Sequence, residues 1–306
     1  MLPSHSPTFD AINQIDCVSL RNSTANVHAS CTKFARTGDD VMDDQQFRQL
    51  LSYFGLSWRG YRKVRRGVKR RIRRHMRDLG SYNIIAYLEE LDKDKEARLQ
   101  CERLFTVSIS RFFRDRKLWE ALREQILPQL VEKHERKIRV WFAGCASGEE
   151  VYSLKILWAG LLPTTGNLPE LEITATDINP AYIERGLIGA YPASSLKELP
   201  EELRSVHFVV KAAERLYFIN TPLKQGIFWQ VHNFLSAPPG YSFDVLFLRN
   251  NLLTYYQNDI KRAAFNKVID ALSCDGILVI GSHEKLPLES SCLVPLPSLS
   301  YVFRKG

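Results

Sequence analysis

Hydrophobic positions along this chain follow two periods, and the change between them divides the sequence. Between residues 43 and 107, apolar residues recur every three or four positions, which is the period of amphipathic helices. From residue 138 onward, short strand-like runs alternate with helical stretches, which predicts an α/β fold with a mostly parallel sheet. We therefore expect a small helical N-terminal domain followed by an α/β domain.

Four helices are predicted in the first part, over residues 43–54, 59–79, 81–91 and 94–107. The second carries one narrow apolar stripe, made of Tyr61, Val64, Val68, Ile72, Met76 and Leu79. Gly80 follows it as a helix-stopping residue, while Gly67 inside it lowers its helix propensity. The boundaries expected from the whole pattern are a loose tail over residues 1–40 with a short helix near 9–18, a helical domain over 41–115 and an α/β domain over 116–306.

In the second part, the strand-like runs are 138–142, 171–176, 243–248 and 277–281, and the helical runs are 149–160, 180–188 and 259–272. The rhythm breaks between residues 191 and 231. A short helix is predicted there over 201–205, followed by apolar runs at 208–210, 216–219 and 227–231. We expect part of this region to form a small antiparallel β appendage on the main sheet.

Positive charge is concentrated in one element. The stretch from Arg59 to Arg77 holds eleven Lys and Arg residues and no acid, and without them the net charge of +8 would become −3. Such a helix can bind an acidic protein surface or nucleic acid, or it can simply be a solvated face. Aromatic residues within it are few, beyond Trp58 and Tyr61, which weighs against nucleic acid.

The remaining composition describes a globular chain, with 45% hydrophobic and 11% aromatic residues. No apolar run approaches membrane-spanning length, and the N-terminus lacks the pattern of a signal peptide. Six scattered cysteines without a C-x-x-C pair favour a reducing compartment over a disulfide framework or a zinc site. We expect a cytoplasmic protein without membrane insertion and without a metal.

The stretch from Val140 to Leu154, VWFAGCASGEEVYSL, predicts a buried strand, a glycine loop and the start of a helix. Gly144 and Gly148 are spaced differently from a dinucleotide-binding loop. Glu149 and Glu150 suit a helix N-terminus, but they would repel a pyrophosphate at the same amides. The loop therefore favours an unphosphorylated, cationic nucleoside such as S-adenosylmethionine, with ordinary helix capping as the alternative.

Three other positions carry candidate chemistry. Asp177 ends the second strand, where an acid can accept both ribose hydroxyls or, alternatively, cap the helix before Pro180. Arg249 follows the strand-like run 243–248, at the sheet edge where ligands bind in open α/β folds. Arg114, after two phenylalanines, either points into the cleft between the domains or forms a surface pair with Asp115.

Motifs in shared order resemble the chemotaxis receptor methyltransferases of the CheR family. They are RRHMRDLG ending at Gly80, FFR ending at Arg114, AGCASGEEVYS ending at Ser153, ATDI, YPASSL, HNFL, LRN and GSHE ending at Glu284. The resemblance covers about residues 47–286. It implies a Rossmann-like, S-adenosylmethionine-dependent enzyme that methylates glutamate side chains of chemoreceptors and produces S-adenosylhomocysteine.

The resemblance also implies roles for individual residues. Those that contact the cofactor would be Ser108, Ser110, Arg114, Glu149, Asp177, Asn233, Phe234, Leu248 and Arg249. Glu149 would meet the methionyl end, Asp177 the ribose, and Asn233 and Phe234 the adenine. Arg114 and a tyrosine after the Arg-Asn pair would flank the transferred methyl group.

The sequence departs from the family pattern at three places. Ser108 stands where the family has asparagine. An ungapped alignment puts Thr254 at the tyrosine position, whereas a slip of one residue puts Tyr255 there; we prefer Tyr255, because a phenol is then available, and expect Tyr256 to be a packing residue. The segment VKAAER from Val210 to Arg215 lacks the glycine turn of members that grip a receptor pentapeptide, so the chain resembles the pentapeptide-independent branch.

The resemblance implies a monomeric protein-glutamate O-methyltransferase whose partner is the helical bundle of a chemoreceptor. The acceptor would be bound by basic-helix residues Arg62, Arg65, Arg66, Lys69, Arg70 and Arg73. A carboxylate is already ionised at neutral pH, so Arg114 and Tyr255 would only need to align it. The alternatives are methylation of another protein or RNA, and a binding protein for the cofactor or its product without catalysis.

Overall fold

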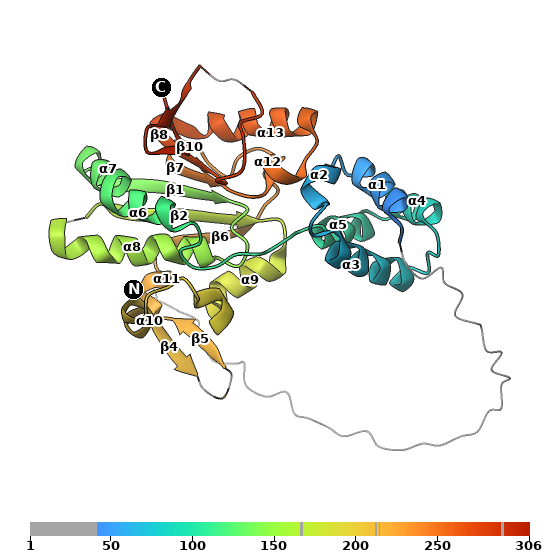
Figure 1. Cartoon of the computed structure of the whole chain (residues 1–306), viewed down its shortest axis with the longest axis horizontal. Coiled ribbons are helices and arrows are strands. Elements are labelled where there is room, and N and C mark those ends of the chain that lie inside the picture. The colour runs from blue at the N-terminus through green and yellow to red at the C-terminus, as the bar shows by residue number, and fades with distance from the viewer. Residues whose placement is uncertain (1–41, 166–167, 212, 214, 289–290) are drawn as a thin grey trace, which may run out of the picture. The chain divides into compact units, whose positions relative to one another are not determined.

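The computed structural model describes residues 42–165, 168–211, 213, 215–288 and 291–306. The predicted tail and the helix near residues 9–18 lie outside these ranges. Within them, the first elements are α-helices α1 (Asp44–Tyr53), α2 (Trp58–Tyr61), α3 (Arg65–Asp78), α4 (Ile84–Lys93) and α5 (Lys95–Leu104). We call them the helical region, which Figure 1 shows as a cluster beside the main sheet.

The helical region forms where its sequence provides caps and an apolar interior. Asp43 accepts a hydrogen bond from the Gln46 amide at 2.7 Å, and the Gln46 side chain accepts one from Asp43, a capping box that begins α1. The predicted stripe of the basic helix points inward, and Val68 and Ile72 are almost completely buried. The prediction of one basic helix was wrong, because a turn at residues 62–64 separates α2 from α3. This break lets α2 pack on helix α12 (Leu252–Tyr255) while α3 packs on α5.

The main sheet has seven strands in the order β6-β2-β1-β7-β8-β10-β9. The first five in this order are parallel, while β10 pairs antiparallel with β8 and β9, so the predicted mostly parallel sheet is confirmed. The strands are β1 (Lys137–Ala143), β2 (Glu170–Asp177), β6 (Ile227–Val231), β7 (Phe243–Leu248), β8 (Leu272–Ile280), β9 (Leu293–Leu296) and β10 (Leu299–Lys305).

Helices cover both faces of this sheet (Figure 1). Alternate residues of β1 point to opposite sides, so Val140 and Phe142 join one core cluster and Trp141 and Ala143 the other. The elements that complete the layers and connections are α6 (Arg116–Ala121), π-helix η1 (Leu122–Ile126), α7 (Leu127–Lys133), α8 (Glu149–Thr165), α9 (Pro180–Ile188), α12 and α13 (Asn258–Asp270).

The predicted antiparallel appendage is present as a three-stranded sheet in the order β3-β5-β4. It consists of β3 (Ala190–Pro192), β4 (Phe208–Lys211) and β5 (Leu216–Ile219), together with 3-10 helix η2 (Ala193–Leu196), α10 (Glu201–His207) and α11 (Thr221–Lys224). The run at 227–231 is not part of it, because β6 pairs with β2 at the edge of the main sheet. Residues 212 and 214 of the expected turn lie outside the described ranges.

Helix α3 ends at a C-terminal cap that depends on Gly80. Gly80 has φ of +68° and its amide donates to the Arg77 carbonyl, while the Ser81 amide donates to the Met76 carbonyl, as in a Schellman cap. A Cβ at Gly80 would meet nothing within 4 Å, so only the backbone conformation penalises a side chain. Gly80→Ala should lower the free energy of unfolding by about 1 kcal/mol in urea denaturation.

The control is Gly160→Ala within α8, where a Cβ also meets nothing within 4 Å and no positive φ is present. It should raise the free energy of unfolding by about 0.5–1 kcal/mol. A Gly80→Ala variant as stable as the parent would contradict the assignment of this helix end.

Candidate functional site

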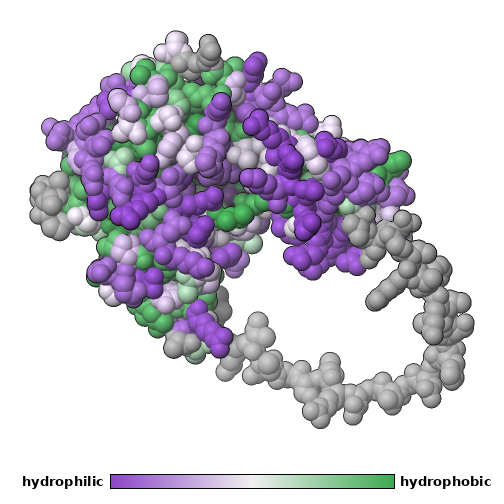
Figure 2. All heavy atoms as spheres, viewed as in Figure 1, coloured by the Kyte–Doolittle hydropathy of each residue, from purple (hydrophilic) through white to green (hydrophobic). Residues whose placement is uncertain are grey.

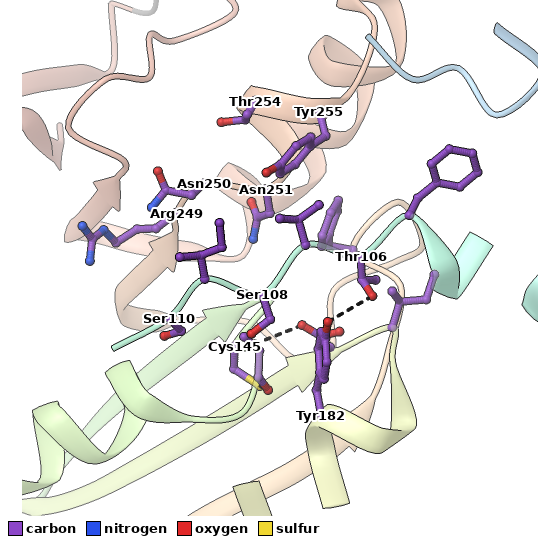
Figure 3. A pocket seen from close by; sticks show the side chains of 18 of the residues that line it. Thr106, Ser108, Ser110, Cys145, Tyr182, Arg249, Asn250, Asn251, Thr254 and Tyr255 are labelled. Atoms are coloured by element: carbon purple, nitrogen blue, oxygen red, sulfur yellow. Dashed lines mark hydrogen bonds between the residues drawn. The ribbon is translucent and has the colours of Figure 1, made fainter. Parts of the chain in front are cut away.

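The carboxyl ends of β1, β2 and β7 meet at the centre of the sheet, and a cavity of about 240 Å³ opens above them. Its walls come from the loops after these strands, from the segment between α5 and α6, and from α2 and α12. Such a position, where neighbouring parallel strands lead away in opposite directions, is the usual ligand site of an open α/β sheet. Figure 3 shows side chains from these elements converging on it.

The loop after β1 forms the floor of the cavity. Gly144 has φ of +84° and Gly148 has φ of +86°, and the amides of Gly144 and Cys145 both donate to the Thr176 carbonyl at 2.8 Å. A Cβ on Gly144 would collide with the Asn251 side chain, whose amide nitrogen donates to the Ala143 carbonyl. The tight turn therefore depends on glycine, and it brings backbone close to the segment after β7.

Asp177 lies at the end of β2 and lines the cavity. Its carboxylate accepts hydrogen bonds from the amides of Ala146 at 3.0 Å and Asn179 at 2.9 Å. Burial raises the pKa of Asp177 to about 6, although these amide bonds act in the opposite direction. The alternative role as helix cap is wrong, because Asn179 caps α9 by accepting from the Ala181 amide.

The two glutamates that begin α8 have different environments. Glu149 is 3% exposed, its Oε2 atom has no hydrogen-bond partner, and burial raises the pKa of its carboxyl while a bond from Ser110 favours ionisation. Ser110 lines the cavity, so this carboxyl lies directly behind the wall. Glu150 itself lines the cavity and pairs with Arg249. An unpartnered buried carboxylate oxygen beside a cavity is suited to a cationic ligand.

Arg249 is the centre of a buried ion-pair cluster. It is 7% exposed and pairs with Glu150 and, at 3.1 Å, with Asp115. Asp115 also accepts a hydrogen bond from the Tyr301 hydroxyl at 3.3 Å. The predicted alternative pair between Arg114 and Asp115 is therefore replaced by a pair with Arg249. Because two carboxylates balance its charge, Arg249 does not give this wall a net positive charge.

Arg114 lines the cavity and donates from its guanidinium to the Ile109 carbonyl. The chain around it is fixed by two bonds to neighbouring elements. The Phe113 amide donates to the Ser153 hydroxyl at 3.0 Å, and Trp119 Nε1 donates to the Arg114 carbonyl at 2.8 Å. Phe113, with φ of +54°, and Asp115, with φ of +72°, bend the backbone on either side of Arg114.

The segment after β7 places Thr254 and Tyr255 differently. The Thr254 hydroxyl donates to Glu284 at 2.5 Å, and the other Glu284 oxygen accepts from the amides of Asn250 and Gly281. Tyr255 presents its ring to the cavity (Figure 3), and burial raises the pKa of its phenol. Tyr256 is half-buried and packs against Phe234, in agreement with its expected packing role, and it also lines the cavity.

Seven of the residues that sequence analysis assigned to the site line this cavity: Ser108, Ser110, Arg114, Asp177, Phe234, Arg249 and Tyr255. Three others lie behind the wall. Glu149 contacts Ser110, Asn233 donates to Glu102 at 3.5 Å, and Leu248 is completely buried in the core. The six basic-helix residues do not line it.

Several lining residues had not been predicted, among them Glu102, Tyr61, Tyr182 and Asn251. Tyr182 lies near Thr106, whose hydroxyl accepts from the Asn179 side chain at 3.1 Å. Tyr61 and Glu102 come from the helical region, so no local sequence pattern connects them with the sheet edge. Asn251 directly follows the Arg249-Asn250 pair, and this position was the one available signal.

Within the ranges that the structure describes, no group of His, Cys, Asp and Glu side chains forms a metal-binding cluster. The same part of the chain contains no helix with the length and apolarity needed to cross a membrane.

The sequence of this chain is similar to those of known methyltransferases. Residues 108–298 match the model of the CheR methyltransferase, SAM binding domain. A chemotaxis protein methyltransferase from Listeria monocytogenes is 34% identical over 200 residues, 65% of this chain and 74% of the relative. Another of that name, from Borreliella burgdorferi, is 27% identical over 68% of this chain and 75% of the relative.

Among solved structures, the N-methyltransferase NodS from Bradyrhizobium japonicum WM9, in complex with S-adenosyl-l-homocysteine, is 16% identical to this chain. The match has a TM-score of 0.30 and covers 63% of this chain and 71% of that chain. The chain belongs to the CheR methyltransferase family and is an S-adenosylmethionine-dependent methyltransferase.

Proposed function

We propose that this enzyme transfers the methyl group of S-adenosylmethionine to glutamate side chains in the cytoplasmic helical bundle of chemoreceptors. The observation that carries the cofactor site is the negative cavity wall, with Asp177 at the end of β2 and the unpartnered oxygen of Glu149 behind Ser110. Sulfonium and ammonium groups complement these carboxylates, whereas a diphosphate would be repelled. Chemotaxis methyltransferases among the relatives support the receptor as acceptor.

The residues that would hold the cofactor follow from their places around the cavity. Asp177 would accept the ribose hydroxyls, and Glu149 with Ser108 and Ser110 would hold the methionyl end. Phe234 would pack on the adenine, and Asn233 would be oriented for it by its hydrogen bond to Glu102. Arg249 and Leu248 would act indirectly, since Arg249 is paired with two acids and Leu248 is buried in the core.

When bound, the cofactor supplies a methyl group that is already electrophilic. A glutamate acceptor is ionised at neutral pH, so the protein does not need a general base. Arg114 can orient the acceptor carboxylate through its guanidinium fork. Tyr255, whose raised pKa keeps the phenol protonated, can donate a hydrogen bond beside it. Alignment and exclusion of water are then the catalytic contributions of this chain.

The acceptor surface would be the exposed side of the basic segment. Arg62, Arg66, Arg70, Arg74 and Arg77 are exposed and recur about once per helical turn; we call them the arginine stripe. Figure 2 shows hydrophilic residues gathered over the helical region. Arg65 and Lys69 instead pair with Asp44 at 3.2 and 2.6 Å, which gives them a role within the fold. Arg73 is half-buried.

We further propose that the protein is a cytoplasmic monomer and that it binds receptors without a C-terminal pentapeptide. Radiolabelled S-adenosylmethionine tests the function directly. Base-labile methyl ester on receptor membranes that lack the pentapeptide would support the proposal. Label in RNA, or tight binding of S-adenosylhomocysteine without any transfer, would contradict it.

Cofactor affinity should depend on the ionisation of Asp177. Burial raises the pKa of Asp177 to about 6, and only the ionised carboxylate accepts both ribose hydroxyls. Binding should therefore strengthen as pH rises through about 6 and level off above it, with roughly tenfold weaker binding at pH 5 than at pH 7.5. Burial also raises the pKa of Glu149, which acts in the same direction.

Calorimetry with S-adenosylhomocysteine across this pH range measures the effect. Asp177→Asn should bind more weakly at every pH and show a shallower pH dependence. Equal affinity of the parent at pH 5 and pH 7.5 would remove Asp177 from ribose recognition.

Arg114→Ala should lower kcat by about a hundredfold, because a misplacement of the acceptor carboxylate by about 1 Å can cost that much. Its unfolding free energy should stay within about 1 kcal/mol of the parent, since Arg114 is only half-buried. Arg111→Ala is a matched control, because Arg111 lies three residues away and pairs with Glu198. Equal methylation rates in the Arg114 variant and the parent would exclude the proposed alignment.

The double variant Arg66→Gln with Arg70→Gln should raise KM for receptor about tenfold, leave kcat unchanged and reduce the salt dependence of the rate. Arg116→Gln with Arg123→Gln removes the same charge from exposed positions on α6 and η1, and it should behave like the parent. If both double variants change KM equally, only the net charge matters and the stripe is not the docking surface.

A further inference from the structure

Helix α2 lies directly on the segment that carries Tyr255. The Ser57 amide donates to the Tyr255 carbonyl at 2.7 Å, and the Gln257 amide donates to the Gly55 carbonyl at 2.9 Å. Between these bonds, Leu56 and Tyr256 form an antiparallel bridge. The helical region is thus joined to the α/β part of the chain by backbone hydrogen bonds at Tyr255 and Gln257, on either side of Tyr256, so the position of α2 and that of Tyr255 are linked.

Gly60 makes this approach possible. A Cβ at Gly60 would collide with the Thr254 carbonyl oxygen and would lie 3.1 Å from the Tyr255 Cα. Because the obstacle is backbone, a side chain here can be accepted only if α2 moves away from the segment. Gly67, seven residues later on α3, has no such constraint, since its Cβ would meet only Arg71 Nη1 at 3.9 Å.

Tyr61 completes the contact from its side chain. Its ring lies 4.8 Å from the Tyr255 ring between centroids and 5.6 Å from the Phe105 ring. Its hydroxyl donates to the Phe105 carbonyl at 3.2 Å, and the residue is 2% exposed. Tyr61 is therefore held from one side by the segment that leads to Arg114 and touches Tyr255 with its ring.

We propose that Gly60 and Tyr61 are positioning residues for methyl transfer, because they fix the ring of Tyr255 at the cavity. This inference rests on the proposed function of Tyr255. A phenol that is displaced by about 1 Å loses its alignment with the acceptor and much of its effect on the rate. Arg62, the first member of the arginine stripe, directly follows Tyr61, so one short segment carries both acceptor docking and the support of Tyr255.

Gly60→Ala and Gly67→Ala form a matched pair for the test. Gly60→Ala should lower kcat on receptor at least about tenfold. Its affinity for S-adenosylhomocysteine should stay within about twofold of the parent, and its KM for receptor should change less than its kcat. Gly67→Ala should leave all three unchanged. If the two variants have the same kcat, Gly60 has no positioning role.

Tyr61 is tested by removing first its hydroxyl and then its ring. Tyr61→Phe keeps the contact with Tyr255 and should retain most of kcat, whereas Tyr61→Leu should lose about as much as Gly60→Ala. Val68→Ala, a cavity in the same helical core, controls for general loosening. An equal loss of kcat in Val68→Ala and Tyr61→Leu would overturn the proposal.

The positioning role of Gly60 and Tyr61 can be tested by a measurement that does not depend on methylation activity. A 3-fluorotyrosine at position 255 reports its surroundings by ¹⁹F NMR. Its resonance should shift or broaden in Gly60→Ala and remain unchanged in Gly67→Ala. A parent enzyme that does not methylate receptors would overturn the proposed function, while an unchanged resonance in Gly60→Ala would overturn the positioning role.

Discussion

Buried carboxyl groups that lack full compensation within the chain are the constraint on which this site depends. Glu149 is almost completely buried with one oxygen unpartnered, and Asp177 is buried enough that its pKa rises to about 6. The folded protein favours the protonated form of Asp177, so this stability contribution is present below about pH 3.8 and is lost as pH rises through about 6. A ligand with positive charge and two hydroxyl donors offsets the cost of ionising these buried carboxyl groups. The same two residues therefore favour ligand binding and reduce the stability of the ligand-free protein at neutral pH.

The charge balance of the other cavity walls also favours a cationic ligand over one that carries phosphates. Arg249 would give the sheet edge a positive charge suited to phosphates, but Glu150 and Asp115 neutralise it. Arg114 is the other arginine that lines the cavity. The walls therefore combine buried carboxylates, which suit a cationic cofactor, with a guanidinium that in the proposed function orients the anionic acceptor. In that proposal, one cavity binds two reactants of opposite charge.

Much of the architecture was predictable from the sequence, because it is determined locally. The period of apolar residues indicated the helices and the central strands, and the spacing of Gly144 and Gly148 indicated the loop after β1. The break between α2 and α3 was not predictable, since the apolar stripe continues through it and the cause is packing on α12. Likewise, the placement of Thr254 depends on Glu284, thirty residues away, so an alignment of the local motif could not distinguish it from Tyr255.

The sheet edge and the helical region contribute different parts of the cavity. The sheet edge provides buried acids that suit the cofactor, at the ends of β1 and β2. The helical region carries the arginine stripe that we propose for the acceptor, and it also completes the cavity with Tyr61, Glu102 and Phe105. Because Ser57 and Gly55 hydrogen-bond to the chain on both sides of Tyr256, separating the regions would expose that wall to water. The helical region is therefore part of the cavity wall, and in the proposed function an acceptor that docks on it would lie beside the group to be transferred.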